Sequence, residues 1–84
     1  MATKYRITFK PRALKDGEKI PKKNLRRIFD KIDQLSDGLQ GDVKRLANFT
    51  PEYRLRVGEY RILFEIEADK IVIYRIRHRK DVYR

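Results

Sequence analysis

The residues best suited to chemistry lie in the segment 53–64, which reads YRLRVGEYRILF. Alternating apolar and polar residues on both sides of a Gly-Glu pair predict two strands joined by a two-residue turn. In that register Arg56 lies directly opposite Arg61, and Arg54 shares their face. Like charges placed opposite each other destabilise a sheet, so the pair indicates a site that holds an anion. Arginine offers a planar fork that matches phosphate oxygens, and phosphate is the leading candidate.

The overall charge supports an anionic partner. The chain has 84 residues, with 22 Lys and Arg against 12 Asp and Glu, and a formal net charge of +10. Such a charge attracts polyanions, and we rank nucleic acid first, an anionic membrane second and an acidic protein third. Before Tyr53 the chain has 8 Lys and 5 Arg, whereas from Tyr53 onward it has 7 Arg and 2 Lys. The second part is therefore the predicted contact surface.

Composition also narrows the class of protein. A chain of this length predicts one domain, residues 1–84, with a small core. It has no Cys, so neither a disulfide framework nor a thiolate zinc site is available. No apolar run approaches the roughly 20 residues that span a bilayer, and residues 1–10 lack the apolar core of a signal peptide. We therefore expect a soluble, cytoplasmic protein with no membrane partner.

Two short elements are predicted at the start of the chain. Residues 4–10 alternate in polarity, which is typical of a half-buried strand, and Pro11 ends it. Residues 12–19 then predict a short helix that turns Ala13 and Leu14 inward.

A longer amphipathic helix is predicted over residues 22–36. Its apolar residues recur every three or four positions and form one stripe, which we expect to lie in the core. The stripe consists of Leu25, Ile28, Phe29, Ile32 and Leu35. We expect residues 38–51 to form a loop, because Gly38 and Gly41 stop the helix.

Strands near 52–57, 60–67 and 71–77 complete the element order β-α-α-β-β-β. Each element must bury its apolar side against another. The predicted fold is therefore α+β, an antiparallel sheet with two helices packed on one face. The arginines then occupy the opposite face.

The register of the last strand decides which of its side chains join the arginines. If Val72, Tyr74 and Ile76 point into the core, alternation places Arg75 and Arg77 on the arginine face. Basic residues of three strands would then share that face. They are Arg54, Arg56, Arg61, Arg75 and Arg77.

The carboxylates bear on the possibility of a metal. Metal-dependent nucleases gather several carboxylates around their ions. On the predicted arginine face only Glu65 clearly qualifies, and we expect it to pair with a neighbouring arginine. We therefore predict neither a metal site nor a cofactor.

Two motifs together carry a resemblance to a known family. One is the hairpin at 53–64, and the other is the ending at 76–83, which reads IRHRKDVY. With the strand at 4–9, the two helices and the strand order, they resemble the RelE branch of the RelE/ParE toxin superfamily over nearly the whole chain. The resemblance implies a small RelE-like domain and a toxin of a type II toxin–antitoxin system. It also implies an mRNA interferase, an endoribonuclease that cuts mRNA in the ribosomal A site and inhibits translation.

The resemblance further implies partners and site residues. The partners would be the ribosome, mRNA and a cognate antitoxin that wraps the toxin in a hetero-oligomer. The predicted catalytic residues are Arg56, Arg61, Arg77, His78 and Tyr83. The predicted RNA- or phosphate-binding residues are Arg54, Arg56, Arg75, Arg79 and Lys80. The family's late basic position falls on Arg77 or Arg79, and the sequence leaves that choice open.

The predicted reaction is metal-independent attack by the RNA 2′-hydroxyl. It needs alignment, a proton acceptor, a proton donor and stabilisation of a dianionic phosphorus. Arg56 and Arg61 suit the phosphate oxygens. The base and acid stay open between His78, because histidine changes charge near neutral pH, and Tyr83, which neighbouring arginines would make more acidic.

Two other functions stay open. The chain is alternatively a ParE-type toxin that poisons DNA gyrase without chemistry of its own, or a non-catalytic RNA-binding domain. Arg56 and Arg61, combined with His78 and Tyr83, favour the nuclease. The sequence does not indicate codon preference or the stoichiometry of the antitoxin complex.

Overall fold

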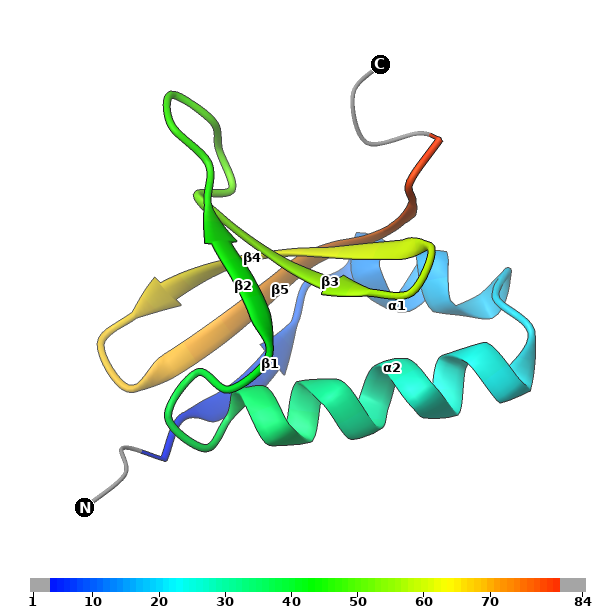
Figure 1. Ribbon diagram of the computed structural model, residues 1–84, viewed down its shortest axis with the longest axis horizontal. Helices are drawn as coiled ribbons and strands as arrows, with labels where there is room; N and C mark the ends of the chain where they lie inside the picture. The colour runs from blue at the N-terminus through cyan, green and yellow to red at the C-terminus, as the bar shows by residue number, and fades with distance from the viewer. Residues whose placement is uncertain (1–3, 81–84) are drawn as a thin grey trace.

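The computed structural model describes residues 4–80 and contains two helices and a five-stranded sheet. The elements are β1 Arg6–Phe9, α1 Pro11–Glu18, α2 Lys22–Leu35, β2 Asp42–Arg45, β3 Tyr53–Val57, β4 Tyr60–Glu67 and β5 Lys70–His78. Both helices lie on one side of the sheet (Figure 1), and we call the opposite side the open face. The predicted α+β fold with two helices on one face is confirmed. Neither helix is long and apolar enough to cross a bilayer.

The strand order is β1-β5-β4-β3-β2. The pairs among β2, β3, β4 and β5 are antiparallel, but β1 runs parallel to β5, with Ile7 beside Ile71. The prediction of a wholly antiparallel sheet is therefore wrong at this pair. Alternating polarity along a strand predicts which side chains face the core, but not which strand pairs with it. The strand that pairs with β1 is β5, at the other end of the chain.

A strand occupies part of the segment that was predicted to be a loop. β2 pairs with β3, with Val43 beside Leu55 and Asp42 beside Arg56. Val43 packs against the core, and the other three residues of the strand are exposed. A four-residue strand with one core residue has too little alternation to be recognised in the sequence. Its pairing with β3 is what stabilises it.

The core lies between the helices and the sheet. Its buried helical residues are Ala13 of α1 with Ile28, Ile32 and Leu35 of α2. Leu14 and Phe29, which were predicted to point inward, are 56% and 43% exposed. Successive helix residues point about 100° apart, so burial of Ala13 and Ile28 leaves the residue that follows each of them at the margin of the core.

A β-bulge changes the predicted register of β5. The pairing with β4 shifts between Leu63 and Phe64, which leaves Tyr74 as an extra residue on β5. The core residues of β5 are Ile71, Ile73 and Ile76. The prediction is therefore right after the bulge, at Ile76. Before the bulge Ile71 and Ile73 join the core cluster, whereas Val72 is buried as predicted but lies outside that cluster.

Candidate active site

The hairpin forms as the sequence predicts. Val57 pairs with Tyr60, and Arg56 pairs with Arg61. Gly58 occupies the first turn position with φ of 57°, a left-handed conformation that glycine adopts without a steric penalty. The two arginines are therefore held face to face by a turn that the local sequence encodes.

The pair belongs to a longer row of charges across the open face. In β5 Arg77 pairs with Arg61, and in β2 Asp42 pairs with Arg56. Cross-strand partners project to the same face, so four neighbouring strands place Asp42, Arg56, Arg61 and Arg77 side by side. We call these four residues the charged row. Sequence reasoning missed Asp42 because its strand was taken for a loop.

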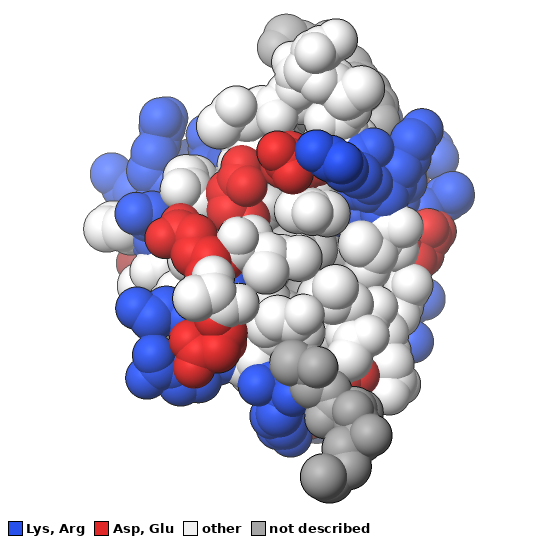
Figure 2. Space-filling view, turned by 90° about the vertical axis from the view of Figure 1, so that its left-hand side faces the viewer, with Lys and Arg blue, Asp and Glu red and all other residues white. Residues whose placement is uncertain are grey.

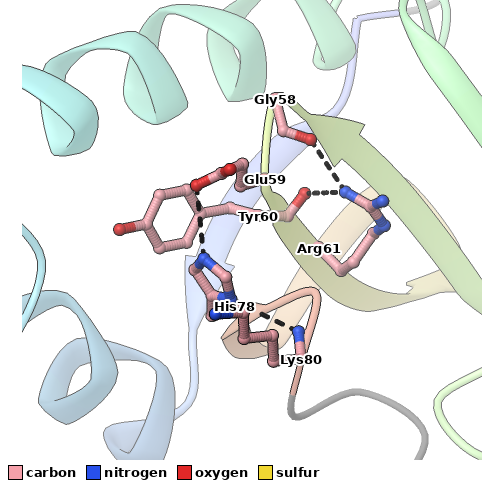
Figure 3. A network of polar contacts seen from close by, with 6 residues as sticks. All are labelled: Gly58, Glu59, Tyr60, Arg61, His78 and Lys80. Carbon is pink, nitrogen blue, oxygen red and sulfur yellow. Dashed lines mark hydrogen bonds and ion pairs between the residues drawn. The ribbon is translucent and has the colours of Figure 1, made fainter.

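Backbone carbonyl groups hold the guanidinium of Arg61 beside the turn. Its Nη1 donates to the carbonyl oxygens of Gly58 at 2.9 Å and Tyr60 at 3.0 Å (Figure 3). A guanidinium fixed in this way loses less conformational entropy when it binds an anion. Arg61 is therefore a preorganised member of the charged row.

Arg54 lies on the open face but below its surface. Its side chain is 12% exposed, and its Nη1 lies 3.7 Å from Asp42 Oδ1. That nitrogen is buried and has no hydrogen-bond partner among the described residues. Arg54 therefore adds positive charge beneath the charged row rather than an exposed fork.

His78 lies on the helical side of the sheet. It pairs with Tyr60, and the two rings meet edge to face with centroids 5.5 Å apart. Its Nδ1 accepts a bond from the Lys80 N–H at 3.3 Å, and its Nε2 lies 3.3 Å from Glu59 Oε2. Figure 3 shows the imidazole and the Arg61 guanidinium on opposite sides of the strand. The structure does not bring His78 to the charged row.

Arg75 is engaged in the fold. Its Nε and Nη2 donate to the two carboxylate oxygens of Asp16 in α1, at 2.7 and 3.0 Å, and the Ile76 N–H donates to the same carboxylate at 3.0 Å. Burial pushes the pKa of Asp16 upward, but these hydrogen bonds outweigh burial and hold that pKa below its usual value. The guanidinium of Arg75 therefore ties α1 to β5.

The remaining predicted residues come after Arg77 in the chain. Arg79 and Lys80 are exposed beyond the end of β5, and the Arg79 N–H donates to the Glu59 carbonyl at 2.7 Å. The register places Arg77, rather than Arg79, beside Arg61. Tyr83 lies outside the described residues.

Other acidic residues, Glu65, Glu67 and Asp69, lie away from the hairpin turn. Glu65 accepts a hydrogen bond from the Glu52 N–H at 2.7 Å, so the arginine partner expected for it is replaced by backbone. Glu67 and Asp69 are exposed at the β4–β5 turn, on the left of Figure 1. Figure 2 views that side and shows a band of acidic side chains between basic flanks. Residues 4–80 contain no group of three or more His, Asp or Glu that could hold a metal ion.

Comparison with known proteins agrees with this architecture. A family model described as ParE toxin of type II toxin–antitoxin systems matches residues 7–83. The chain is 32% identical to Toxin RelE3 of Methanocaldococcus jannaschii, over 93% of this chain and 94% of that protein.

Solved structures show the same similarity. A chain of the RelB-RelE antitoxin–toxin complex from Methanococcus jannaschii has a TM-score of 0.77 and 32% identity, covering 90% of this chain and 94% of that one. A chain of the RelBE2 complex from Mycobacterium tuberculosis has a TM-score of 0.76 and 27% identity, covering 89% and 98%. The hairpin and the strand order agree with these matches, which extend along nearly the whole chain. The chain therefore belongs to the ParE toxin family, within the RelE/ParE superfamily of type II toxins.

Proposed function

We propose that this toxin is an endoribonuclease that cuts mRNA in the ribosomal A site without a metal ion. The observation that carries the proposal is the charged row, in which Arg56, Arg61 and Arg77 adjoin one another on the open face. Three cations on neighbouring strands repel one another and suit a ligand that carries several negative oxygens. A scissile phosphate in its dianionic transition state is such a ligand.

The proposed reaction is an intramolecular transfer within RNA. The 2′-oxygen forms a bond to phosphorus while the bond from phosphorus to the leaving 5′-oxygen breaks. Arginine forks that bind the phosphate oxygens act most strongly when negative charge builds up, and this difference lowers the barrier. The ribosome supplies alignment of the mRNA, which is worth several powers of ten in effective concentration.

Mapping of mRNA ends in cells tests the proposed function. Brief induction of the toxin is expected to stop translation and to produce new mRNA ends at positions that occupy the A site. The pure protein is expected to cut free RNA weakly, with or without magnesium. A DNA-damage response with intact mRNA would instead identify a gyrase poison, and strong magnesium-dependent cleavage of free RNA would contradict the mechanism.

We also propose that a cognate antitoxin docks on the helical side. The solved relatives are toxin–antitoxin complexes. Phe9, Leu14, Leu25 and Phe29 line one apolar hollow between α1 and α2. The adjoining surface carries the cations Lys22, Lys23 and Arg26. An amphipathic antitoxin helix with acidic flanks fits this combination.

Leu14→Ala tests the docking site, because this exposed side chain supports little of the core. A hot-spot residue contributes at least about 2 kcal/mol to binding, so antitoxin affinity is expected to fall about 30-fold, as measured by calorimetry. Translation arrest by the toxin alone should be unchanged. Phe49→Ala is the matched control, since Phe49 is 48% exposed and lies outside the hollow. Unchanged affinity for Leu14→Ala would place the antitoxin elsewhere.

A further inference from the structure

The charged row can grip a phosphate, but its arginines cannot accept a proton. An arginine guanidinium stays protonated in proteins. His78, the most obvious alternative base, lies on the other side of the sheet, where its Nε2 faces Glu59. Among residues 4–80, a proton acceptor on the open face must therefore be a different side chain.

Most carboxylates near the hairpin already have close polar partners. Asp16 binds Arg75, Glu52 binds Arg45, Glu59 binds His78, and Glu65 accepts from a backbone N–H. Asp42 differs from them. Its side chain is 58% exposed, and its contact with Arg54 Nη1 is 3.7 Å, which is longer than a hydrogen bond. Asp42 therefore has oxygen atoms that are accessible to a substrate.

The strand register also places Asp42 next to Arg56 and Arg61, the arginine pair proposed to bind phosphate. Asp42 pairs with Arg56, and Arg56 pairs with Arg61. Neighbouring strands lie about 4.8 Å apart. A phosphate held by the two arginines therefore lies about one strand spacing from Asp42, which is within reach of the ribose attached to that phosphate.

From this geometry we propose that Asp42 is the proton acceptor for the RNA 2′-hydroxyl, an inference that rests on the proposed function. The proton of the 2′-hydroxyl moves to a carboxylate oxygen of Asp42 while the 2′-oxygen forms its bond to phosphorus. The bond from phosphorus to the 5′-oxygen breaks, and the 5′-oxygen takes a proton from water. The products are a 2′,3′-cyclic phosphate and a 5′-hydroxyl, and Asp42 returns its proton to solvent.

Single-turnover cleavage of ribosome-bound mRNA by Asp42→Asn tests the proposal. Asparagine keeps the shape but cannot accept the proton, so the cleavage rate should fall about 10²–10⁴-fold. Ribosome affinity should not fall, because the variant loses a negative charge. Asp42→Glu should recover part of the rate. Glu67→Gln is the matched control, since it removes one exposed carboxylate at the far end of the same sheet and should cleave like the wild type.

The pH dependence separates proton transfer from a structural role. The charged groups whose strand positions share the open face with Asp42 include its row neighbours Arg56, Arg61 and Arg77. Arg54 and Lys44 lie beside them, and Glu65 lies farther along β4. Without a carboxylate the reaction relies on hydroxide, so the rate of Asp42→Asn should rise about tenfold per pH unit. The ratio of the wild-type cleavage rate to the Asp42→Asn cleavage rate should therefore fall as the pH rises.

Two results would overturn the inference while the proposed function stands. One is cleavage by Asp42→Asn within about threefold of the wild-type rate. The other is a constant rate ratio across pH together with lower thermal stability, which would mean that Asp42 only supports Arg54. If the wild type itself leaves A-site mRNA intact, the proposed function fails, and this inference fails with it.

Discussion

Arg61→Ala is expected to lower mRNA cleavage about 10²–10³-fold, the usual loss when one preorganised transition-state donor is removed. The guanidinium is fixed by the carbonyl oxygens of Gly58 and Tyr60, so its position does not depend on the substrate. The protein should still fold, because the substitution also removes the repulsion between Arg61 and Arg56 across the hairpin. The measurement is the single-turnover cleavage rate on programmed ribosomes, with ribosome affinity measured separately.

Two further variants make this result interpretable. Arg61→Lys keeps the positive charge but loses the planar fork, so its rate should lie between those of the wild type and the alanine variant. Arg12→Ala removes an exposed arginine from α1, on the helical side, and should leave cleavage unchanged. If Arg61→Ala loses ribosome affinity and cleavage by the same factor, the chain is a binding domain rather than a nuclease.

Asp16→Asn is expected to reduce the free energy of unfolding by about 2–3 kcal/mol, because charged hydrogen bonds contribute about 1.5–3 kcal/mol. Its carboxylate binds Arg75 through both oxygens and also accepts from the Ile76 N–H. These three bonds join α1 to β5, across 59 and 60 positions of sequence. Urea unfolding at neutral pH measures the loss. Asp30→Asn, an exposed carboxylate in α2, is the control and should change little.

The pKa of this carboxylate predicts how the stability difference between the wild type and Asp16→Asn depends on pH. The hydrogen bonds lower the pKa of Asp16 in the folded protein, so the unfolded chain takes up the proton first as the pH falls. The stabilisation is complete above the ordinary aspartate pKa of 3.8, which the unfolded chain retains, and disappears as the pH drops through the lower folded value. The free energies of unfolding of the wild type and Asp16→Asn should therefore differ by a constant amount near neutral pH and become equal in strong acid. A difference that persists unchanged in strong acid would contradict this account.

Coupling between the two partners can also be measured directly. If the ion pair acts as one unit, Arg75→Gln and Asp16→Asn should not have additive effects on the free energy of unfolding. Additive effects would mean that each side chain is stabilised by other contacts.

The sequence by itself determined the hairpin and the pairing of Arg56 with Arg61. Alternation set the faces of both strands, Gly58 set the turn, and together they placed Arg56 opposite Arg61. These features involve residues close together in the chain, so local pattern and turn chemistry are enough to predict them. The amphipathic pattern likewise fixed α2 and most of its buried side.

Tertiary structure alone decided the rest of the site. Asp42 enters the charged row only because β2 pairs with β3, and His78 leaves it because its strand position projects to the helical side. Arg75 was expected to face the substrate, but a partner in α1 holds its guanidinium. Each of these outcomes depends on which distant segment lies alongside a residue. Alternation within one strand does not contain that information, because it specifies the face of a side chain and not the neighbour across the gap.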